Sequence, residues 1–434
     1  MLKNILKTVI TNIITFEARM VLRKYHPQII AVTGSVGKTS TKDAIYAAIA
    51  PHFFVRKSQK SFNSEIGVPL TILGCPNAWN SVFGWIGNIT DGFLLIFWRH
   101  AYPKILIIEV GADRPGDIKK ITSWLKPDMV IVTKFAPVPV HVEFFGSPKK
   151  VIEEKSELVK ALKENGLLIL SSDDEDVLSL KSLVRRKTIT FGFGSGADIR
   201  GTNEAIEYEK SGNYDKPIGQ LFRVDAGGNS VPVSVKNSIG RHVTYSVLAA
   251  FAVGMNLGLN MVKLSHALSS YSTPNGRMRL IDGIKGSVII DDSYNSSPVA
   301  AKEALETLGA IQSGGKKIAV LGDMMELGKY SVEEHRSIGN LTSITANLMA
   351  TVGIRARDIA EGALEAGMDE RKILQYEKSE EAGKELERFI SQGDIILIKG
   401  SQSVRMEKTV EEVMAHPEEK DKLLVRQEKQ WQKR

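Results

Sequence analysis

The sequence predicts an α/β protein built from two units, each on a mostly parallel sheet. Short apolar runs at 29–34, 105–111 and 129–133 alternate with segments of helical spacing, and a second such series begins after the turn at 273–276. Strands that alternate with helices give parallel sheets with helical crossovers. The single cysteine, Cys75, excludes an internal disulfide framework and a Cys-based zinc cluster, so buried apolar packing must hold these units together.

Composition and charge narrow the class of protein. The chain has 434 residues, of which 43% are hydrophobic and 25% charged, values that exclude a disordered chain, a collagen and a coiled-coil rod. The net charge is +7, a mild excess that favours anionic ligands or surfaces. Residues 1–60 carry ten Lys or Arg against Glu17 and Asp43. No aromatic and basic residues interleave as in nucleic-acid binding, so we expect no nucleic-acid partner.

Residues 1–28 read as a basic amphipathic helix that ends at Pro27. Its apolar residues recur at helical spacing and Lys or Arg side chains lie between them. No small-residue cleavage site follows, so a secretory signal peptide is not expected. Two alternatives stay open, a helix packed on the next domain and a helix lying in a membrane interface.

A second apolar segment, rich in aromatic residues, covers 79–100. Its run from 81 to 98 approaches the length of a membrane span, but Asp91, Asn88 and three glycines interrupt it. The sequence leaves three readings: a membrane span, an interfacial patch or hairpin, and an insertion that is buried or faces a partner.

The first unit, 29–274, contains a glycine-rich turn between the strand 29–34 and a helix expected at 41–50. Backbone N–H groups of such a turn can surround phosphate oxygens, and the following helix N-terminus adds partial positive charge. A lysine then reaches the β and γ phosphates and a hydroxyl faces Mg²⁺. The pattern is shortened, because Val32 occupies the position of the usual first glycine. The sequence therefore predicts a P-loop-type ATPase domain, with ATP-binding residues Gly34, Ser35, Val36, Gly37, Lys38, Thr39 and Ser40.

The rest of this unit is expected to contain a short helix at 117–126, irregular β structure at 186–236, and helices at 241–257 and 261–270. The second unit, 275–415, is predicted as a Rossmann-like C-terminal α/β domain. It has no G-x-G-x-x-G turn after its first strand, so dinucleotide binding is not indicated. Its strands are expected at 287–291, 317–322, 348–353, 372–376 and 394–400, and the tail 416–434 is expected to be a charged, solvated helix.

Three side chains of the first unit are candidate catalytic or metal-binding groups. Glu109 ends a strand, where parallel sheets face their ligands, and a carboxylate beside a phosphate loop suits Mg²⁺. His141 follows another strand end, although a lone histidine is more often a structural hydrogen-bonding residue. Lys155 lies among acidic residues on a helix and, on its own, reads as a solvated side chain.

Several ordered strings resemble the Mur ligase family, in particular the enzymes that add D-alanyl-D-alanine to a UDP-muramoyl tripeptide. The resemblance covers residues 29–415. The strings that carry it are TGSVGKTSTKD (33–43), SFNSEIGVPLTIL (61–73), IIEVGADRPGDI (107–118), VTKFAPVPVHVEFFGS (132–147), EKSEL (154–158), IIDDSYNSSP (289–298), AVLGDMMELG (319–328) and IKGSQSVRME (398–407).

The resemblance implies roles for individual residues. Lys38 and Thr39 would hold ATP phosphates and Mg²⁺, and Lys155 matches the lysine that this family carbamylates with CO₂. The implied metal ligands are Thr39, Glu109, His141 and Lys155. The implied substrate-side residues are Asn63 and Glu65, and the implied residues that close over ATP from the C-terminal domain are Arg277, Asp292, Tyr294 and Asn295.

The chain departs from the family pattern in places. Family members usually carry a UDP-sugar-binding domain before the strand that leads into the phosphate loop. In this chain, 28 residues precede that strand. Both asparagines of the string GxHNxxN are replaced in GRHVTYS (240–246), and Lys134 stands for another asparagine.

The activity implied by the resemblance is an ATP-dependent amide ligase of cell-wall peptide assembly. It would activate the carboxylate of a muramoyl-peptide-like substrate as an acyl phosphate for attack by an amine such as D-Ala-D-Ala. Two alternatives remain: a ligase at the membrane surface that acts on a different or lipid-linked carboxylate, and a non-catalytic nucleotide-binding scaffold. The expected location is cytoplasmic, with the inner face of the membrane as the alternative.

Overall fold

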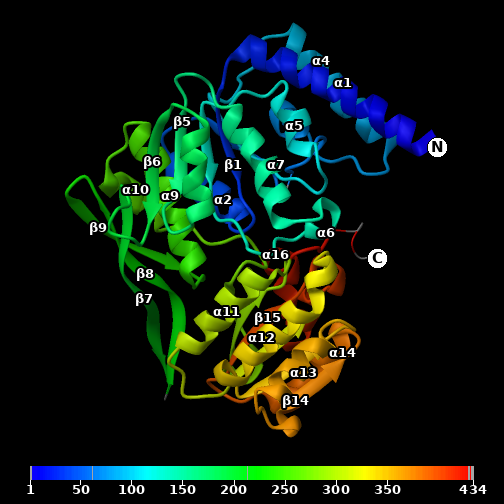
Figure 1. Cartoon of the computed structure of the whole chain (residues 1–434), viewed down its shortest axis with the longest axis vertical. Coiled ribbons are helices and arrows are strands. Elements are labelled where there is room, and N and C mark those ends of the chain that lie inside the picture. Colours follow the sequence, from blue (N-terminus) through cyan, green and yellow to red (C-terminus); the bar gives the residue numbers. More distant parts are fainter. Residues whose placement is uncertain (1, 61, 213, 429–430, 432–434) are drawn as a thin grey trace.

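The computed structural model shows two α/β domains, one above the other in Figure 1, with an N-terminal helix across the upper end. It describes residues 2–60, 62–212, 214–428 and 431. Ser61, which belongs to one of the quoted strings, and residues 429–430 and 432–434 of the expected charged tail lie outside the described part.

The first domain is built on a nine-stranded sheet in the order β2-β3-β1-β4-β5-β6-β7-β8-β9. Its strands are β1 (Gln28–Thr33), β2 (Val55–Lys57), β3 (Ile105–Glu109), β4 (Met129–Val132), β5 (Leu167–Ser171), β6 (Lys187–Gly192), β7 (Ile199–Ser211), β8 (Tyr214–Ala226) and β9 (Asn229–Lys236). Its helices are α1 (Leu2–Tyr25), α2 (Lys38–Ile49), α3 (Gly67–Leu73), α4 (Val82–Phe97), α5 (Asp117–Thr122), α6 (Val142–Phe145), α7 (Pro148–Lys160), α8 (Glu175–Ser179), α9 (Arg241–Asn256) and α10 (Met261–Leu268).

Alternate residues of the central strands enter two separate cores. Ile30 and Val32 of β1 pack with α2 and α9, whereas Ile29 and Ala31 pack with α1, α3 and α5 on the other face. A strand buried on both faces reads as a continuous apolar run, which is why periodicity located β1, β3 and β4 closely. Because these strands are parallel, their carboxyl ends share one edge of the sheet.

The second domain carries a six-stranded sheet in the order β10-β11-β15-β12-β13-β14, parallel except for the β10–β11 pair. Helices cover both faces, since separate cores contain residues of α11 and α12 on one side and of α14 and α15 on the other. The doubly wound prediction is therefore confirmed. The elements are β10 (Arg279–Asp282), β11 (Val288–Asp292), α11 (Pro298–Ala310), β12 (Lys317–Gly322), α12 (Ser331–Thr345), β13 (Leu348–Val352), α13 (Arg357–Glu365), β14 (Ile373–Tyr376), α14 (Ser379–Leu386), β15 (Ile395–Lys399), α15 (Glu407–Val413) and α16 (Lys420–Leu423).

Two sequence expectations need correction. Residues 186–236 form β structure as expected, but apart from two register shifts it is regular: β7 and β8 form a long antiparallel hairpin that continues into β9. The tail is not a solvated helix, because within 416–428 only α16 is α-helical and Leu424 and Arg426 are buried. Arg426 folds back to pair with the buried Glu407 at 2.9 Å, which compensates a charge that burial would otherwise make costly.

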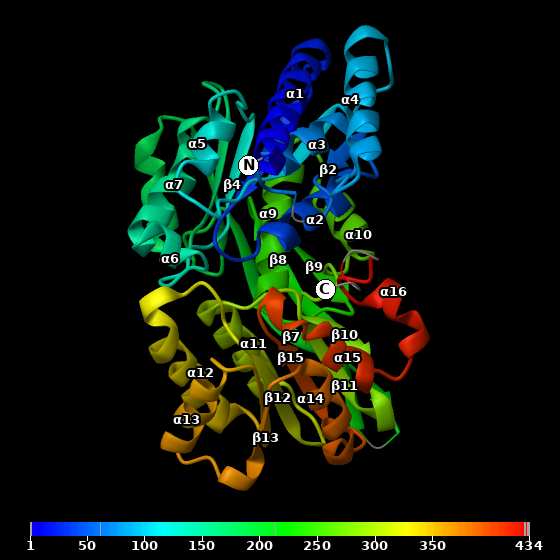
Figure 2. The ribbon, with the colours of Figure 1, turned by 90° about the vertical axis from the view of Figure 1, so that its right-hand side faces the viewer.

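The N-terminal helix α1 packs on the first domain and on α4, as Figures 1 and 2 show. Ile14, Ala18 and Val21 are fully buried, so the packed-helix alternative is confirmed for this face of α1. Among the described residues, no helix combines the length and the apolar character that crossing a membrane requires. The span reading of 81–98 is therefore not supported.

Candidate functional site

The phosphate loop lies between β1 and α2 and packs against the end of β4. Gly34 and Gly37 have positive φ angles of 141° and 84°. A Cβ atom on Gly34 would lie 2.0 Å from Thr133 Oγ1, so only glycine fits there. Thr133 donates from Oγ1 to Val36 O at 2.6 Å, and Ser35 N donates to Lys134 O at 2.7 Å. These contacts fix the loop where α2 begins.

Glu109 at the end of β3 faces the start of α2. Its side chain is 1% exposed, and it accepts hydrogen bonds from Thr39 Oγ1 at 2.9 Å and from Asn63 Nδ2 at 3.2 Å. The surface-turn reading of Glu109 is thereby excluded. A buried carboxylate beside a threonine hydroxyl offers the oxygen ligands that Mg²⁺ prefers.

Two lysines of α2 bring positive charge to the same place. Lys38 donates from Nζ to Gly34 O at 2.9 Å, and burial lowers the pKa of its ammonium. Lys42 is fully buried; its Nζ donates to Ser58 O at 2.8 Å and lies 4.0 Å from Glu109 Oε2. Lys42 thus ties α2 to the segment that carries Asn63.

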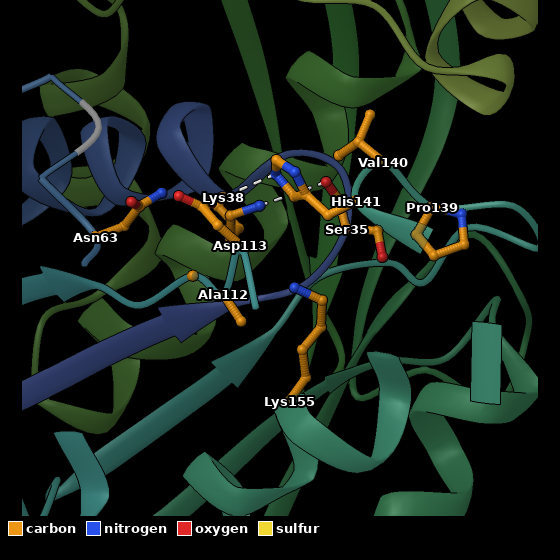
Figure 3. A pocket seen from close by; sticks show the side chains of 10 residues that line it. Ser35, Lys38, Asn63, Ala112, Asp113, Pro139, Val140, His141 and Lys155 are labelled. Carbon is orange, nitrogen blue, oxygen red and sulfur yellow. Dashed lines mark hydrogen bonds and ion pairs between the residues drawn. The ribbon is translucent and has the colours of Figure 1, made fainter. Parts of the chain in front are cut away.

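Lys155 on α7 turns its amine into the pocket beside the phosphate loop. Figure 3 shows its side chain reaching toward Ser35, with Asp113 and His141 on the same pocket. It is 5% exposed, so the solvated-face reading is wrong. No carboxylate of the described residues lies within ion-pair distance of its Nζ. Burial, with repulsion from Lys38 as the next cause, lowers the pKa of Lys155 to about 7.

His141 precedes α6 and lies between two carboxylates. Its Nδ1 is 2.5 Å from Glu326 Oε2, and its Nε2 is 3.5 Å from Asp113 Oδ1. Glu326 belongs to the second domain, so this contact bridges the domains, and it lowers the pKa of the Glu326 carboxyl. His141 and Glu326 both adopt positive φ angles, 69° and 63°, a conformation uncommon for these residue types.

The residues expected from the second domain form a cluster of their own. Arg277 stacks on the Tyr294 ring at 4.1 Å. Lys399 Nζ binds Asp292 Oδ2 at 2.5 Å and Asn295 O at 3.0 Å. None of these residues is among those that line the pocket in the described part of the chain. The positive charge of Arg277 nevertheless acts on Lys38 and contributes to the lowered pKa of the Lys38 ammonium.

The structure thus brings together most of the predicted site. Ser35, Lys38, Asn63, His141 and Lys155 line one pocket, and Glu109 joins it through its hydrogen bonds to Asn63 and Thr39. Glu65 does not line this pocket; it forms an exposed ion pair with Lys120 at 3.7 Å. The described residues contain no group of three or more His, Cys, Asp or Glu side chains suited to a metal ion, so Glu109 and His141 need other donors beside them.

Three residues of the site were missed from the sequence: Lys42, Asp113 and Glu326. All three lie in strings already quoted, namely 33–43, 107–118 and 319–328. Their positions within these strings could have indicated that they belong to the site. The burial of Lys42 and the contact of Glu326 across the domains, however, depend on tertiary packing.

The departures from the family pattern have local partners. Lys134 Nζ pairs with Glu303 Oε1 of the second domain at 2.6 Å. At the two asparagine positions of the string 240–246, Val243 is buried in the core, and Ser246 donates from Oγ to His242 O at 2.8 Å. His242, which matches the histidine of that string, has a buried Nε2 atom with no hydrogen-bond partner among the described residues. Lys134 therefore links the two domains, whereas Val243 and Ser246 pack inside the first domain.

Each of the two domains matches a known family of protein domains. Residues 91–254 match the Mur ligase middle domain, and residues 276–402 match the Mur ligase, glutamate ligase domain.

Similar proteins cover most of the chain. The UDP-N-acetylmuramoyl-tripeptide--D-alanyl-D-alanine ligase of Bacillus subtilis (strain 168) is 28% identical over 401 residues, covering 92% of this chain and 79% of the relative. The ligase of the same name from Escherichia coli (strain K12) is 27% identical, covering 91% and 78%. The crystal structure of MurF ligase from Thermotoga maritima in complex with ADP superposes with a TM-score of 0.74 at 26% identity, covering 93% of this chain and 83% of that one.

Proposed function

Because this chain belongs to the Mur ligase family, we propose that it is an ATP-dependent amide ligase that joins a muramoyl-peptide carboxylate to the amine of D-Ala-D-Ala. The substrate pair comes from the names of its relatives. The observation that carries the proposal is the pocket where the phosphate loop, Lys155 and His141 meet beside the second domain. A non-catalytic scaffold would have no need to keep these groups together.

The reaction we propose has two steps. The substrate carboxylate oxygen attacks the γ-phosphorus of ATP, and the bond from that phosphorus to the β–γ bridging oxygen breaks, giving an acyl phosphate and ADP. The amine nitrogen then attacks the acyl carbon, and the tetrahedral intermediate expels inorganic phosphate while the nitrogen loses a proton. Lys38 and the loop N–H groups hold and neutralise the phosphates. The contact between His141 and Glu326 holds the second domain beside the pocket, where it would limit water access to the acyl phosphate.

The residues of this pocket fit magnesium. Thr39 and Glu109 supply oxygen donors. With Nδ1 of His141 directed to Glu326, its Nε2, which lies 3.5 Å from Asp113 Oδ1, would be the atom that binds a metal, as in many metal-binding histidines. We propose that these three residues and Lys155 hold the metal, which would neutralise the charge on the transferring phosphoryl oxygens.

Carbamylation of Lys155 by CO₂ would complete this donor set. The side chain is buried and its Nζ has no carboxylate partner among the described residues. A neutral amine nitrogen can attack CO₂ and lose a proton, which converts a buried cation beside Lys38 into an anion with two oxygen donors. That exchange removes the repulsion from Lys38 that now acts on Lys155.

The cytoplasm is the location that ATP and nucleotide-linked substrates imply, and we propose it for this chain. A second candidate is a ligase at the inner membrane face that takes a lipid-linked carboxylate. The observation that favours it is the set of apolar side chains exposed on α1 and α4.

The test is ADP release by the full chain with ATP, Mg²⁺, UDP-muramoyl peptides and D-Ala-D-Ala, beside lipid-linked equivalents and other amines. We expect ADP release that requires both a carboxylate and an amine. Lys38→Ala should lower the rate by about a hundredfold or more, while Lys119→Ala on the exposed face of α5 should not change it. The proposal would be contradicted if ADP release does not depend on the carboxylate and the amine, or if the Lys38→Ala variant releases ADP at the rate of the unchanged chain.

A further inference from the structure

The helix α4 packs Trp85, Ile89, Leu95 and Ile96 against the core, but it leaves a second set of apolar side chains exposed to solvent. Phe83 is 87% exposed, Phe97 is 63% exposed and Phe93 is exposed as well, whereas Asn88 is 4% exposed and Gly92 is buried. A helix on the surface of a soluble protein normally buries its apolar stripe. The additional exposed apolar face of α4 therefore points to a partner on its outer side.

The inner face of α4 is fitted to its neighbours, so the helix cannot simply rotate to bury the phenylalanines. Asn88 donates from Nδ2 to Pro76 O at 2.8 Å. At Gly92, a Cβ atom would lie 2.4 Å from Glu17 Oε2 of α1. Glycine at this position thus permits the close approach of the two helices, and the outward direction of Phe93 follows from it.

The helix α1 carries a second exposed apolar stripe. Leu6, Val9, Ile13 and Phe16 follow one another at helical spacing and are all exposed, while another face of the helix is buried in the domain. Of the 22 large apolar side chains exposed among the described residues, twelve lie on α1, on α4 or in the residues that flank α4. Exposed apolar surface of this concentration marks an interaction site.

The two helices form one projecting structure. Lys24 Nζ donates to Leu95 O at 2.9 Å and to Ile96 O at 3.0 Å, and Tyr25 donates from its hydroxyl to Leu95 O. Figures 1 and 2 both show α1 and α4 side by side at the end of the molecule away from the second domain. A flat surface can meet them there without obstruction from the second domain.

The charges of this structure favour an anionic partner. Lys7, Arg19, Arg23 and Arg99 are exposed beside the apolar side chains, whereas Asp91 is the exposed acid of α4. Each Lys or Arg near an anionic leaflet adds to the attraction. Exposed tryptophans, Trp79 and Trp98, flank α4, and this residue type concentrates at the membrane–water interface.

We propose that α1 and α4 seat the protein on an anionic lipid surface, with the exposed apolar side chains entering the boundary between headgroups and acyl chains. Since no described helix is long and apolar enough to cross a membrane, the contact is peripheral. Amphipathic helices with one apolar and one basic face bind membranes in this way.

The experiment is sedimentation of the full chain with large vesicles, either phosphatidylglycerol mixed with phosphatidylcholine or phosphatidylcholine alone, at low and high salt. We expect binding to the anionic vesicles that weakens with salt, accompanied by a blue shift of tryptophan emission. Phe83→Ser combined with Phe97→Ser should lower vesicle partitioning about tenfold or more. The matched control is Ile344→Ser combined with Ile354→Ser, which changes two exposed apolar side chains of the second domain and should bind like the unchanged chain.

Two results would overturn the proposal. The first is equal partitioning of the unchanged chain and the Phe83, Phe97 double variant. The second is no vesicle binding together with a concentration-dependent dimer that the double variant loses, which would make this surface an interface between two copies. Ligation of soluble substrates is measured separately, and both double variants should retain it, so failure of lipid binding leaves the proposed ligase activity intact.

Discussion

Lys155 allows a quantitative test, because the burial that prepares it for carbamylation also makes its charged form costly. Its pKa is lowered to about 7, from 10.5 for an ordinary lysine. At neutral pH about half of the amine is then uncharged and able to attack CO₂, against fewer than about one in 10³ for a solvated lysine. The native state binds this proton more weakly than the unfolded chain does. The resulting loss of stability is absent well above about pH 10.5, grows as pH falls, and is complete below about pH 7.

The size of that loss sets the expected result. A shift of this size corresponds to an upper limit of roughly 5 kcal/mol in the free energy of unfolding. Lys155→Met keeps the apolar stem and removes the charge. In CO₂-free buffer near neutral pH we expect it to unfold at a higher urea concentration than the unchanged chain, while ligation falls at least about a hundredfold. Lys150→Met, an exposed position on the same helix α7, should change neither quantity.

Carbon-13 bicarbonate then reports on the modification itself. We expect a carbamate resonance in the unchanged chain and in Lys150→Met that Lys155→Met lacks, and a rise in stability with bicarbonate that follows the same pattern. The reasoning is refuted if the unchanged chain shows no carbamate signal, gains no stability from bicarbonate and ligates normally in CO₂-free buffer.

Two further predictions concern carboxyl groups, Glu17 and Glu326. Burial raises the pKa of Glu17 to about 7, so its ionisation destabilises the native state progressively above about pH 4.5; Glu17→Gln should raise the free energy of unfolding by about 3 kcal/mol near pH 8 and leave it unchanged near pH 4. Urea titration checks this against Asp91→Asn on the exposed face of α4, and equal effects of the two substitutions would contradict it. Glu326→Gln removes the carboxylate that orients His141 and should raise the magnesium concentration required for ligation by about 10- to 100-fold. Glu333→Gln, which is exposed on α12, is the control for that titration, and an unchanged magnesium requirement in Glu326→Gln would exclude the orienting role.

The sequence located β1, β3, β4 and the five parallel strands of the second sheet because most of them are apolar runs buried on both faces. It did not name β5, which is buried in the same way. A strand such as β1 or β15 has no solvent face, so its letters form an uninterrupted apolar run whose ends are easily seen. The same argument placed Glu109 correctly, since a charged residue directly after such a run must lie at the edge of the sheet. The long hairpin of β7 and β8 was not recognised, because one of its faces is partly exposed and charged residues interrupt its alternation.

Contacts between distant segments were beyond the reach of the sequence. Lys155 is surrounded by acidic residues in the chain, yet α7 turns its amine inward, away from them, and into the pocket. The pairing of Arg426 with Glu407 and the contact of Glu326 with His141 each join elements that no local pattern connects. Burial decides these roles, and burial of a charged residue depends on packing across the whole domain.

The pocket and the exposed helices place two different demands on the first domain. The pocket needs β1, β3 and β4 to end together, and the core beneath them includes Ile14, Ala18 and Val21 of α1. The same helix carries the outward stripe that includes Phe16. Removing α1 to abolish lipid binding would therefore expose the core under the sheet and disturb the pocket, whereas substitutions confined to the exposed stripe leave that packing in place. For this reason, surface substitutions rather than truncation separate the membrane contact from ligation.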